Sequence, residues 1–124
     1  MKIVCVDQSR LGLLKLKRIV KEIVPDAEVD DCRKPSEVLL KAGNGKVDVL
    51  LTETDFGRSR WEGLQFARKM KELNPHMNII FVTAESGNEI GEEFISLRAS
   101  GMITKPYGAW DVRKEFENLR YPVG

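Results

Sequence analysis

The chain has 124 residues, of which 42% are hydrophobic and 31% are charged, and this length and composition indicate one globular domain. The formal net charge is +1, so the chain has no charge excess for binding nucleic acid or an anionic membrane. No stretch approaches the roughly 20 apolar residues of a membrane-spanning helix, and the first apolar run is too short for a signal peptide. We therefore expect one cytoplasmic domain over residues 1–124 that binds neither membranes nor nucleic acid directly.

Short apolar runs alternate with amphipathic segments along the whole chain. Most of these runs are rich in β-branched residues and are bounded by turn residues, so they predict strands that are largely buried. The five predicted strands are Lys2–Val6, Ala27–Cys32, Val47–Glu53, Met77–Ala84 and Gly101–Thr104. The second strand is the most polar, and we expect it at an edge of the sheet.

The segments between these strands have apolar residues at helical spacing, and prolines or glycines close several of them. The five predicted helices are Ser9–Val24, Pro35–Gly43, Glu62–Leu73, Asn88–Ala99 and Ala109–Leu119. A turn is expected at Gly43–Gly45. Inward side chains are predicted at Leu13, Leu16, Val20, Ile23, Leu64, Ala67, Met70, Ile90, Phe94, Leu97, Val112, Phe116 and Leu119. Five strand–helix units predict a parallel sheet with helices on both faces.

Polar residues follow several of the predicted strands, at what would be one edge of the sheet. The first strand is followed by Asp7 and Gln8, the third ends at Glu53, the fourth contains Thr83 near its end, and Lys105 follows the fifth. In such a sheet, ligands bind outside the carboxyl ends of the strands. Two carboxylates, a hydroxyl and an ammonium could bind a divalent cation and a phosphoryl group, chemistry that depends mainly on positioning and charge neutralisation.

The motifs IVCVDQ, DVLLTE, IIFVTA and ITKPY resemble those of the CheY-like receiver domains of bacterial two-component response regulators, over nearly the whole chain. The resemblance implies a signalling module rather than an enzyme. Together with the strand–helix alternation, it implies a flavodoxin-like, doubly wound α/β fold. We expect a five-stranded parallel sheet in the order 2-1-3-4-5 within a three-layer α/β/α sandwich. The C-terminal stretch is also similar to receivers that precede a DNA-binding output module, which would lie beyond Gly124.

Several positions depart from the family pattern. The resemblance implies an acidic Mg²⁺ ligand and a phosphoaccepting aspartate at the positions where Gln8 and Glu53 stand. An amide supplies no charge against a cation, and the Glu53 carboxylate lies about 1.5 Å farther from the chain than that of an aspartate. Thr83 and Lys105 keep the family identities, whereas Met102 stands where many receivers have an aromatic switch residue.

We therefore expect only weak Mg²⁺ binding, at a vestigial site of Asp7 and Gln8. Compared with the family, the loop after Glu53 is two residues longer and lacks the usual proline, so we do not expect the backbone carbonyl near Asp55 to complete the metal shell as the resemblance would imply. Asp55 is a weak candidate for a replacement acceptor because the loop has left the strand there. Within this loop we expect Trp61 to cover the start of the next helix.

Three functions remain open. In the first, the protein is a signalling module that works without phosphorylation, and Glu53 lies near Lys105 as a built-in anion. This module would contact a protein partner, either a histidine kinase or an output domain, through residues 88–119. In the second, an active receiver accepts a phosphoryl group inefficiently from a histidine kinase. The third, a flavodoxin-type electron carrier, shares only the fold class, because DQSRLG does not resemble its phosphate loop. The sequence does not determine the oligomeric state, and a homodimer is one of the alternatives.

Overall fold

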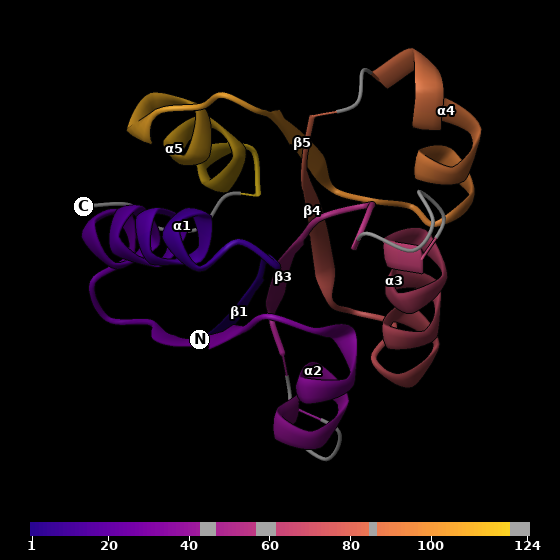
Figure 1. The fold of residues 1–124 in the computed structure, drawn as a ribbon, viewed down its shortest axis with the longest axis horizontal. Coiled ribbons are helices and arrows are strands. Elements are labelled where there is room, and N and C mark those ends of the chain that lie inside the picture. Colours follow the sequence, from indigo (N-terminus) through magenta and orange to yellow (C-terminus); the bar gives the residue numbers. More distant parts are fainter. Residues whose placement is uncertain (43–46, 57–61, 85–86, 120–124) are drawn as a thin grey trace.

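A single parallel sheet organises the protein. The computed structural model describes residues 1–42, 47–56, 62–84 and 87–119. Its strands are β1 (Lys2–Val6), β2 (Glu28–Cys32), β3 (Val49–Thr52), β4 (Asn78–Thr83) and β5 (Gly101–Thr104). They lie in the order β2-β1-β3-β4-β5 (Figure 1), and every pair of neighbours is parallel. The predicted sheet and its strand order are confirmed, and so is the edge position of the second strand.

Five helices cover the two faces of this sheet. They are α1 (Arg10–Ile23), α2 (Pro35–Ala42), α3 (Glu62–Leu73), α4 (Gly87–Ser96) and α5 (Ala109–Asn118). Figure 1 shows α1 and α5 on one side of the strands and α2, α3 and α4 on the other. The fold is therefore the predicted three-layer α/β/α sandwich.

The first helix shows how the sequence produces this packing. The Ser9 hydroxyl accepts a hydrogen bond from the Gly12 backbone N–H at 3.2 Å, which caps the start of α1. The helix ends at Ile23, and the Val24 N–H still donates to the Val20 carbonyl before Pro25. All four side chains predicted to point inward from this helix are buried.

The core consists of two apolar clusters separated by the sheet. Successive residues of a strand point to opposite faces, so Ile3 and Cys5 join the cluster under α1 and α5, whereas Val4 and Val6 join the other. All four side chains are fully buried. The predicted inward residues of α3 and α5 are buried as well, except that Leu119 is partly buried against the first cluster. Burial on both faces is what a central parallel strand requires.

Two predicted boundaries are wrong by more than one residue. The third strand begins at Val49, not Val47, and the Asp48 carboxylate accepts a hydrogen bond from the Lys2 backbone N–H at 2.7 Å beside its start. Helix α4 ends at Ser96, not Ala99, because the chain turns with Arg98 at φ 54°. The third strand also ends one residue early, at Thr52, so Glu53 lies just beyond it. The other predicted ends agree within one residue.

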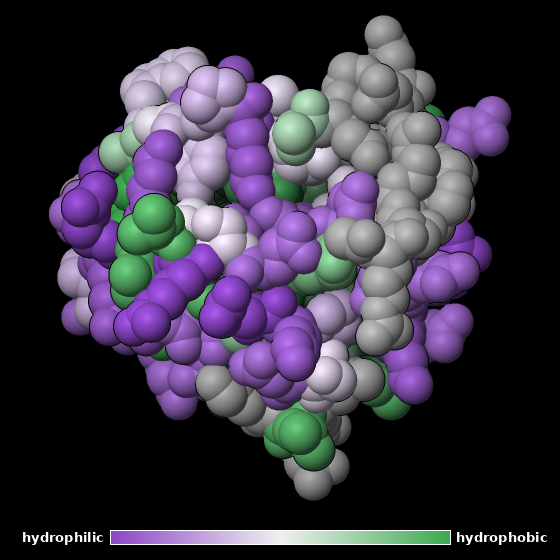
Figure 2. Space-filling view, in the orientation of Figure 1, coloured by the Kyte–Doolittle hydropathy of each residue, from purple (hydrophilic) through white to green (hydrophobic). Residues whose placement is uncertain are grey.

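Three predictions lie outside the described residues and side chains: the turn at Gly43–Gly45, the position of Trp61 and the inward side chain of Ile90. In the described part of the chain, no helix combines the length and apolar character needed to cross a membrane. Figure 2 shows a largely hydrophilic face with a few separate hydrophobic side chains. Among the side chains that the structure describes, the most exposed large apolar ones are Leu11, Leu40, Ile95 and Trp110.

Candidate functional site

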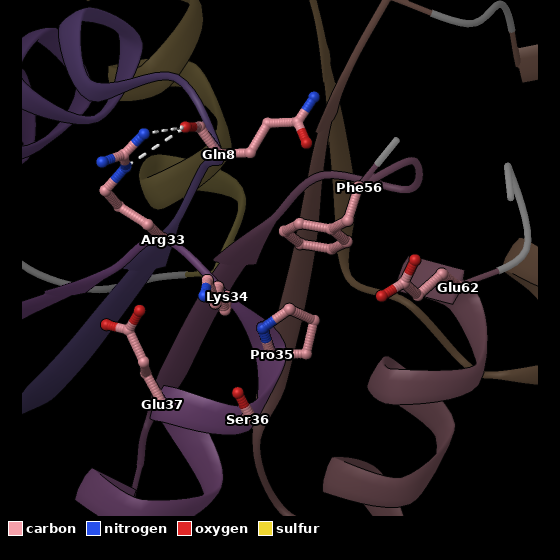
Figure 3. Close-up of a pocket in the computed structure, with 8 residues that line it drawn as sticks. All are labelled: Gln8, Arg33, Lys34, Pro35, Ser36, Glu37, Phe56 and Glu62. Carbon is pink, nitrogen blue, oxygen red and sulfur yellow. Dashed lines mark hydrogen bonds between the residues drawn. The ribbon is translucent and has the colours of Figure 1, made fainter. Parts of the chain in front are cut away.

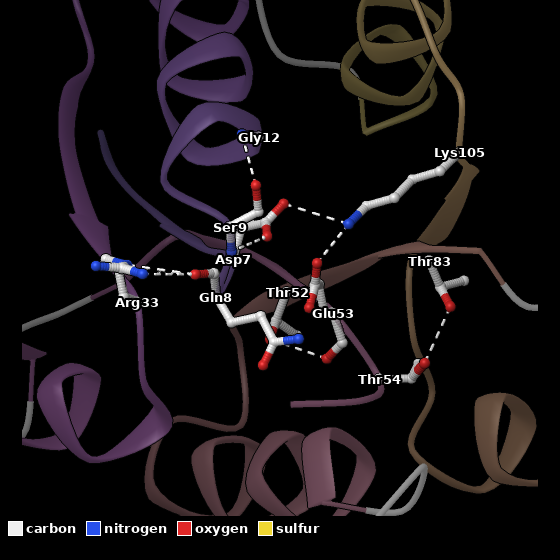
Figure 4. A network of polar contacts seen from close by, with 10 residues as sticks. All are labelled: Asp7, Gln8, Ser9, Gly12, Arg33, Thr52, Glu53, Thr54, Thr83 and Lys105. Carbon is white, nitrogen blue, oxygen red and sulfur yellow. Dashed lines mark hydrogen bonds and ion pairs between the residues drawn. The ribbon is translucent and has the colours of Figure 1, made fainter. Parts of the chain in front are cut away.

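Three charged side chains meet at the carboxyl end of the sheet (Figure 4). Asp7 follows β1, Glu53 follows β3 and Lys105 follows β5. The Lys105 ammonium contacts Oε1 of Glu53 and lies 3.3 Å from Oδ2 of Asp7. Asp7 is 1% exposed and Glu53 is 8% exposed, so a single, partly exposed cation faces two buried carboxylates. The predicted contact between Glu53 and Lys105 is confirmed.

The first turn of α1 fixes the Asp7 carboxylate. Oδ1 of Asp7 accepts a hydrogen bond from the Ser9 backbone N–H at 2.8 Å, and Oδ2 faces Lys105. A Cβ atom at Gly12 would lie 2.7 Å from Oδ2, so only a glycine lets the helix approach this closely. Both oxygens of Asp7 therefore have a defined partner.

The start of α3 fixes the chain around Glu53 in the same way. The Gly63 backbone N–H donates to the Thr54 carbonyl at 2.9 Å. A Cβ atom at Gly63 would lie 2.2 Å from the Glu53 carbonyl oxygen and 2.6 Å from the Thr54 Cα, both of which are backbone atoms. The helix therefore packs directly on the segment that presents Glu53.

Burial and crowding shift the ionisation of these groups. Burial raises the pKa of the Glu53 carboxyl from 4.5 to about 7; the hydrogen bond and charge of Asp7 add to the rise, whereas Lys105 opposes it. Burial lowers the pKa of Lys105, but its contacts with Glu53 and Asp7 outweigh burial and raise that pKa above its ordinary value. Lys105 is therefore a firmly held cation, and Glu53 changes its charge near neutral pH.

Thr83 lies at the same edge of the sheet but has a different partner. Its hydroxyl is 3.0 Å from the Thr54 hydroxyl, and both threonines are buried (Figure 4). The strand register explains the pair: Thr52 lies opposite Phe81, so two residues further along Thr54 lies opposite Thr83. Sequence reasoning selected Thr83 and missed Thr54, although the register between β3 and β4 would have indicated it.

Gln8 lies outside the cluster of charged side chains. It is exposed, and its backbone carbonyl accepts hydrogen bonds from Arg33 at 3.1 and 3.3 Å. Its side chain lines a cleft of about 730 Å³ (Figure 3). The other lining residues are Arg33, Lys34, Pro35, Ser36, Glu37, Phe56 and Glu62. Asp55, the alternative acceptor, is exposed.

The donor set suits a hard divalent cation poorly. Such ions need several oxygen ligands with negative charge. The described residues contain no group of three or more His, Cys, Asp or Glu side chains arranged for a metal ion. The Lys105 ammonium contacts both Asp7 and Glu53, and Gln8 offers only a neutral amide oxygen. Weak Mg²⁺ binding at Asp7 and Gln8 stays a prediction.

The segment after Lys105 is anchored to α1. The Lys15 ammonium donates to the Tyr107 carbonyl at 2.6 Å and lies 4.4 Å from the centre of the Tyr107 ring. Burial and then the charge of Asp7 raise the pKa of Tyr107 to about 12. The Lys105–Pro106 peptide bond, just before Tyr107 in the chain, is cis. These contacts hold the Lys105 backbone next to the first helix, a feature that the sequence did not indicate.

In a doubly wound parallel sheet, ligands bind outside the carboxyl ends of the strands, which is where the two buried carboxylates and Lys105 lie. Residues 3–117 match the model of the response regulator receiver domain. The chain belongs to this family, whose members serve two-component signalling and interact with histidine kinases and output domains. Receiver domains are generally signalling modules rather than enzymes.

The chain is also similar to individual proteins of known sequence or structure. The cyclic di-GMP phosphodiesterase response regulator RpfG of Xanthomonas campestris is 28% identical over 119 residues, which are 94% of this chain and 31% of RpfG. The chain thus spans about a third of that relative's length. The chemotaxis response regulator CheY4 of Vibrio cholerae has a TM-score of 0.81 at 20% identity, covering 95% of this chain and 97% of CheY4. A two-component response regulator from Clostridium difficile has a TM-score of 0.82 at 18% identity, covering 97% and 96%. Both structures share the fold.

Proposed function

We propose that this receiver-type module signals without phosphorylation and that Glu53 serves as a built-in anion for Lys105. The observation that supports this most directly is the contact between the Lys105 ammonium and Oε1 of Glu53. The extra methylene of a glutamate extends the carboxylate by about 1.5 Å relative to an aspartate. A charge-assisted hydrogen bond to Lys105 then forms without an added phosphoryl group.

The charge on this anion depends on pH. With a pKa of about 7, the Glu53 carboxyl is largely neutral in mildly acidic solution and largely ionised above neutral pH. Lys105 stays positive throughout because its pKa is raised. The proposed signalling state should therefore strengthen as the pH rises through 7, which distinguishes it from a state fixed by packing alone.

The same contacts argue against efficient phosphoryl chemistry in this chain. Phosphoryl transfer in such sites depends on a cation and on exact placement of the acceptor. Here Lys105 lies against both carboxylates, and the position of the second acidic residue is taken by Gln8. We infer weak Mg²⁺ affinity and no productive reaction with small phosphoryl donors.

Output would pass through protein contacts of residues 88–119. Exposed apolar side chains support this, with Ile95 on α4 at 75% exposure and Trp110 on α5 at 68%. The relative RpfG is named as a phosphodiesterase response regulator, and only its receiver part corresponds to this chain. For the present protein we infer a histidine kinase or an output domain as the partner.

Intact mass after incubation with acetyl phosphate and Mg²⁺ tests this proposal. We expect no phosphoryl adduct on the wild type, on Glu53→Ala or on Glu53→Asp, because Gln8 still lacks charge. The double variant Glu53→Asp with Gln8→Asp restores both carboxylates, and we expect a partial adduct on it. An adduct on the wild type that Glu53→Ala abolishes would overturn the proposal and establish an active receiver with Glu53 as the acceptor.

A further inference from the structure

A second cleft lies at the end of the sheet opposite to the three charged side chains. It has a volume of about 470 Å³ and lies between the second half of α3 and the end of α4. Figure 1 shows these two helices side by side on the same face of the sheet. The residues that line the cleft are Arg68, Lys71, Glu72, Pro75, Ser96, Leu97 and Arg98.

The cleft has an excess of positive charge. Three of its lining residues are cations, and Glu72 carries the only carboxylate among them. Arg68 donates a hydrogen bond to the Ser96 hydroxyl at 3.4 Å, which links α3 to the end of α4. Lys71 donates to the Met77 carbonyl at 2.6 Å. Burial and then the charge of Arg98 lower the pKa of Lys71, so Lys71 and Arg98 lie close enough to repel each other.

Arg98 occupies a position that usually favours glycine. Its φ of 54° lies in the left-handed region. Its N–H donates to the Ile95 carbonyl at 3.0 Å, and the Ala99 N–H donates to the Phe94 carbonyl at 3.1 Å, the pattern that ends a helix with a left-handed residue. A long cation therefore stands where a glycine would be less strained. Within the described residues, Arg98 forms no ion pair with a carboxylate.

We propose that this cleft binds a phosphate-bearing small molecule, with Arg68, Lys71 and Arg98 facing the phosphate. Guanidinium groups match the geometry of phosphate oxygens, and binding an anion would relieve the repulsion between Lys71 and Arg98. The volume is in the range of small-molecule sites. Pro75 and Leu97 provide an apolar wall for the organic part of the ligand. This inference does not depend on the role of Glu53.

Binding can be followed by the backbone amide signals of the whole protein in two-dimensional NMR. The probes are inorganic phosphate, pyrophosphate and ribose 5-phosphate, with ribose as the uncharged control. We expect saturable shifts at Ser96 and Arg98 with all three anions and none with ribose. The organic phosphate should bind more tightly than inorganic phosphate and should raise the Tm. If inorganic phosphate binds as tightly as ribose 5-phosphate, the cleft is a site for the free ion, and the proposal of an organic phosphate ligand is overturned.

The decisive variant is Arg98→Gly. Glycine suits the left-handed backbone, so the variant should fold and melt no lower than the wild type. It should nevertheless bind the anions at least about tenfold more weakly, since charge-assisted hydrogen bonds are lost. Arg18→Gln, an exposed change on α1, removes the same charge away from the cleft and should bind normally. Shifts that grow without saturation, or equal binding by Arg98→Gly and the wild type, would overturn the proposal.

Discussion

Polar groups are paired differently at the two ends of the parallel sheet. Around the amino ends of the strands, polar groups are paired one to one: the Asp48 carboxylate accepts from the Lys2 N–H at 2.7 Å, and the Ser100 hydroxyl donates to Asn78 at 2.8 Å. At the carboxyl ends, Asp7 and Glu53 share the single ammonium of Lys105. Paired groups hold the fold together, whereas an unbalanced buried set costs free energy and is typical of functional sites.

The largest loss of stability should come from filling the contact between α3 and the chain after β3. A Cβ atom at Gly63 would meet the Glu53 carbonyl at 2.2 Å, and backbone atoms cannot move aside easily. Gly63→Ala should lower the free energy of unfolding by about 3 kcal/mol or more. Urea denaturation measures this change.

Gly91→Ala is the matched control for that substitution. Gly91 lies within α4, and a Cβ atom there would have nothing within 4 Å. Alanine favours a helix over glycine, so this variant should gain roughly 0.5 to 1 kcal/mol. Equal effects of the two substitutions would show that α3 does not pack closely on the Glu53 segment.

The next largest effect concerns the pH dependence of stability. The folded protein keeps the Glu53 proton to a higher pH than the unfolded chain does, because burial raises this pKa from 4.5 to about 7. The native state therefore binds more protons in that interval, and the free energy of unfolding falls as the pH rises from about 4.5 to 7. Glu53→Gln removes this titration and should be more stable than the wild type above pH 7, by roughly 2 kcal/mol. Denaturation at pH 5 and pH 8 checks this, and parallel profiles of the two proteins would contradict it.

A smaller and pH-independent loss is expected at the amino end. The Asn74 side-chain amide donates to the Val47 carbonyl at 3.1 Å. Asn74→Ala removes this neutral hydrogen bond and should cost about 1 kcal/mol at pH 5 and pH 8 alike. A cost that changes with pH would mean that the amino end also contains a group whose ionisation is coupled to Asn74.

The smallest expected effect is the coupling between two buried hydroxyls. Thr54 and Thr83 lie 3.0 Å apart. Thr54→Val and Thr83→Val should each cost about 1 kcal/mol, since each leaves the partner hydroxyl without this hydrogen bond. The double variant should cost less than the sum, with a coupling of roughly 0.5 kcal/mol or more in a double-mutant cycle. Additive losses would show that the pair is not coupled.

The sequence predicts the fold well because the apolar periodicity that defines each strand and helix also determines its burial. It also indicates which residues reach the carboxyl end, since Asp7, Glu53 and Lys105 directly follow strands. It does not indicate the pairing of Thr83 with Thr54, which depends on strand register. The early end of α4 was missed because the left-handed turn occurs at Arg98, a residue type that does not favour it.

The most direct test of the built-in anion is an NMR titration of the Glu53 side-chain carboxyl carbon in the wild type and in Lys105→Met. In the wild type the midpoint should lie near pH 7, since burial and Asp7 raise the pKa while Lys105 opposes the rise. Loss of the ammonium removes the one opposing charge, so the midpoint should move to a higher pH in Lys105→Met. A midpoint near 4.5 that is the same in both proteins would show that Glu53 is solvated and unpaired, and it would contradict the proposed role.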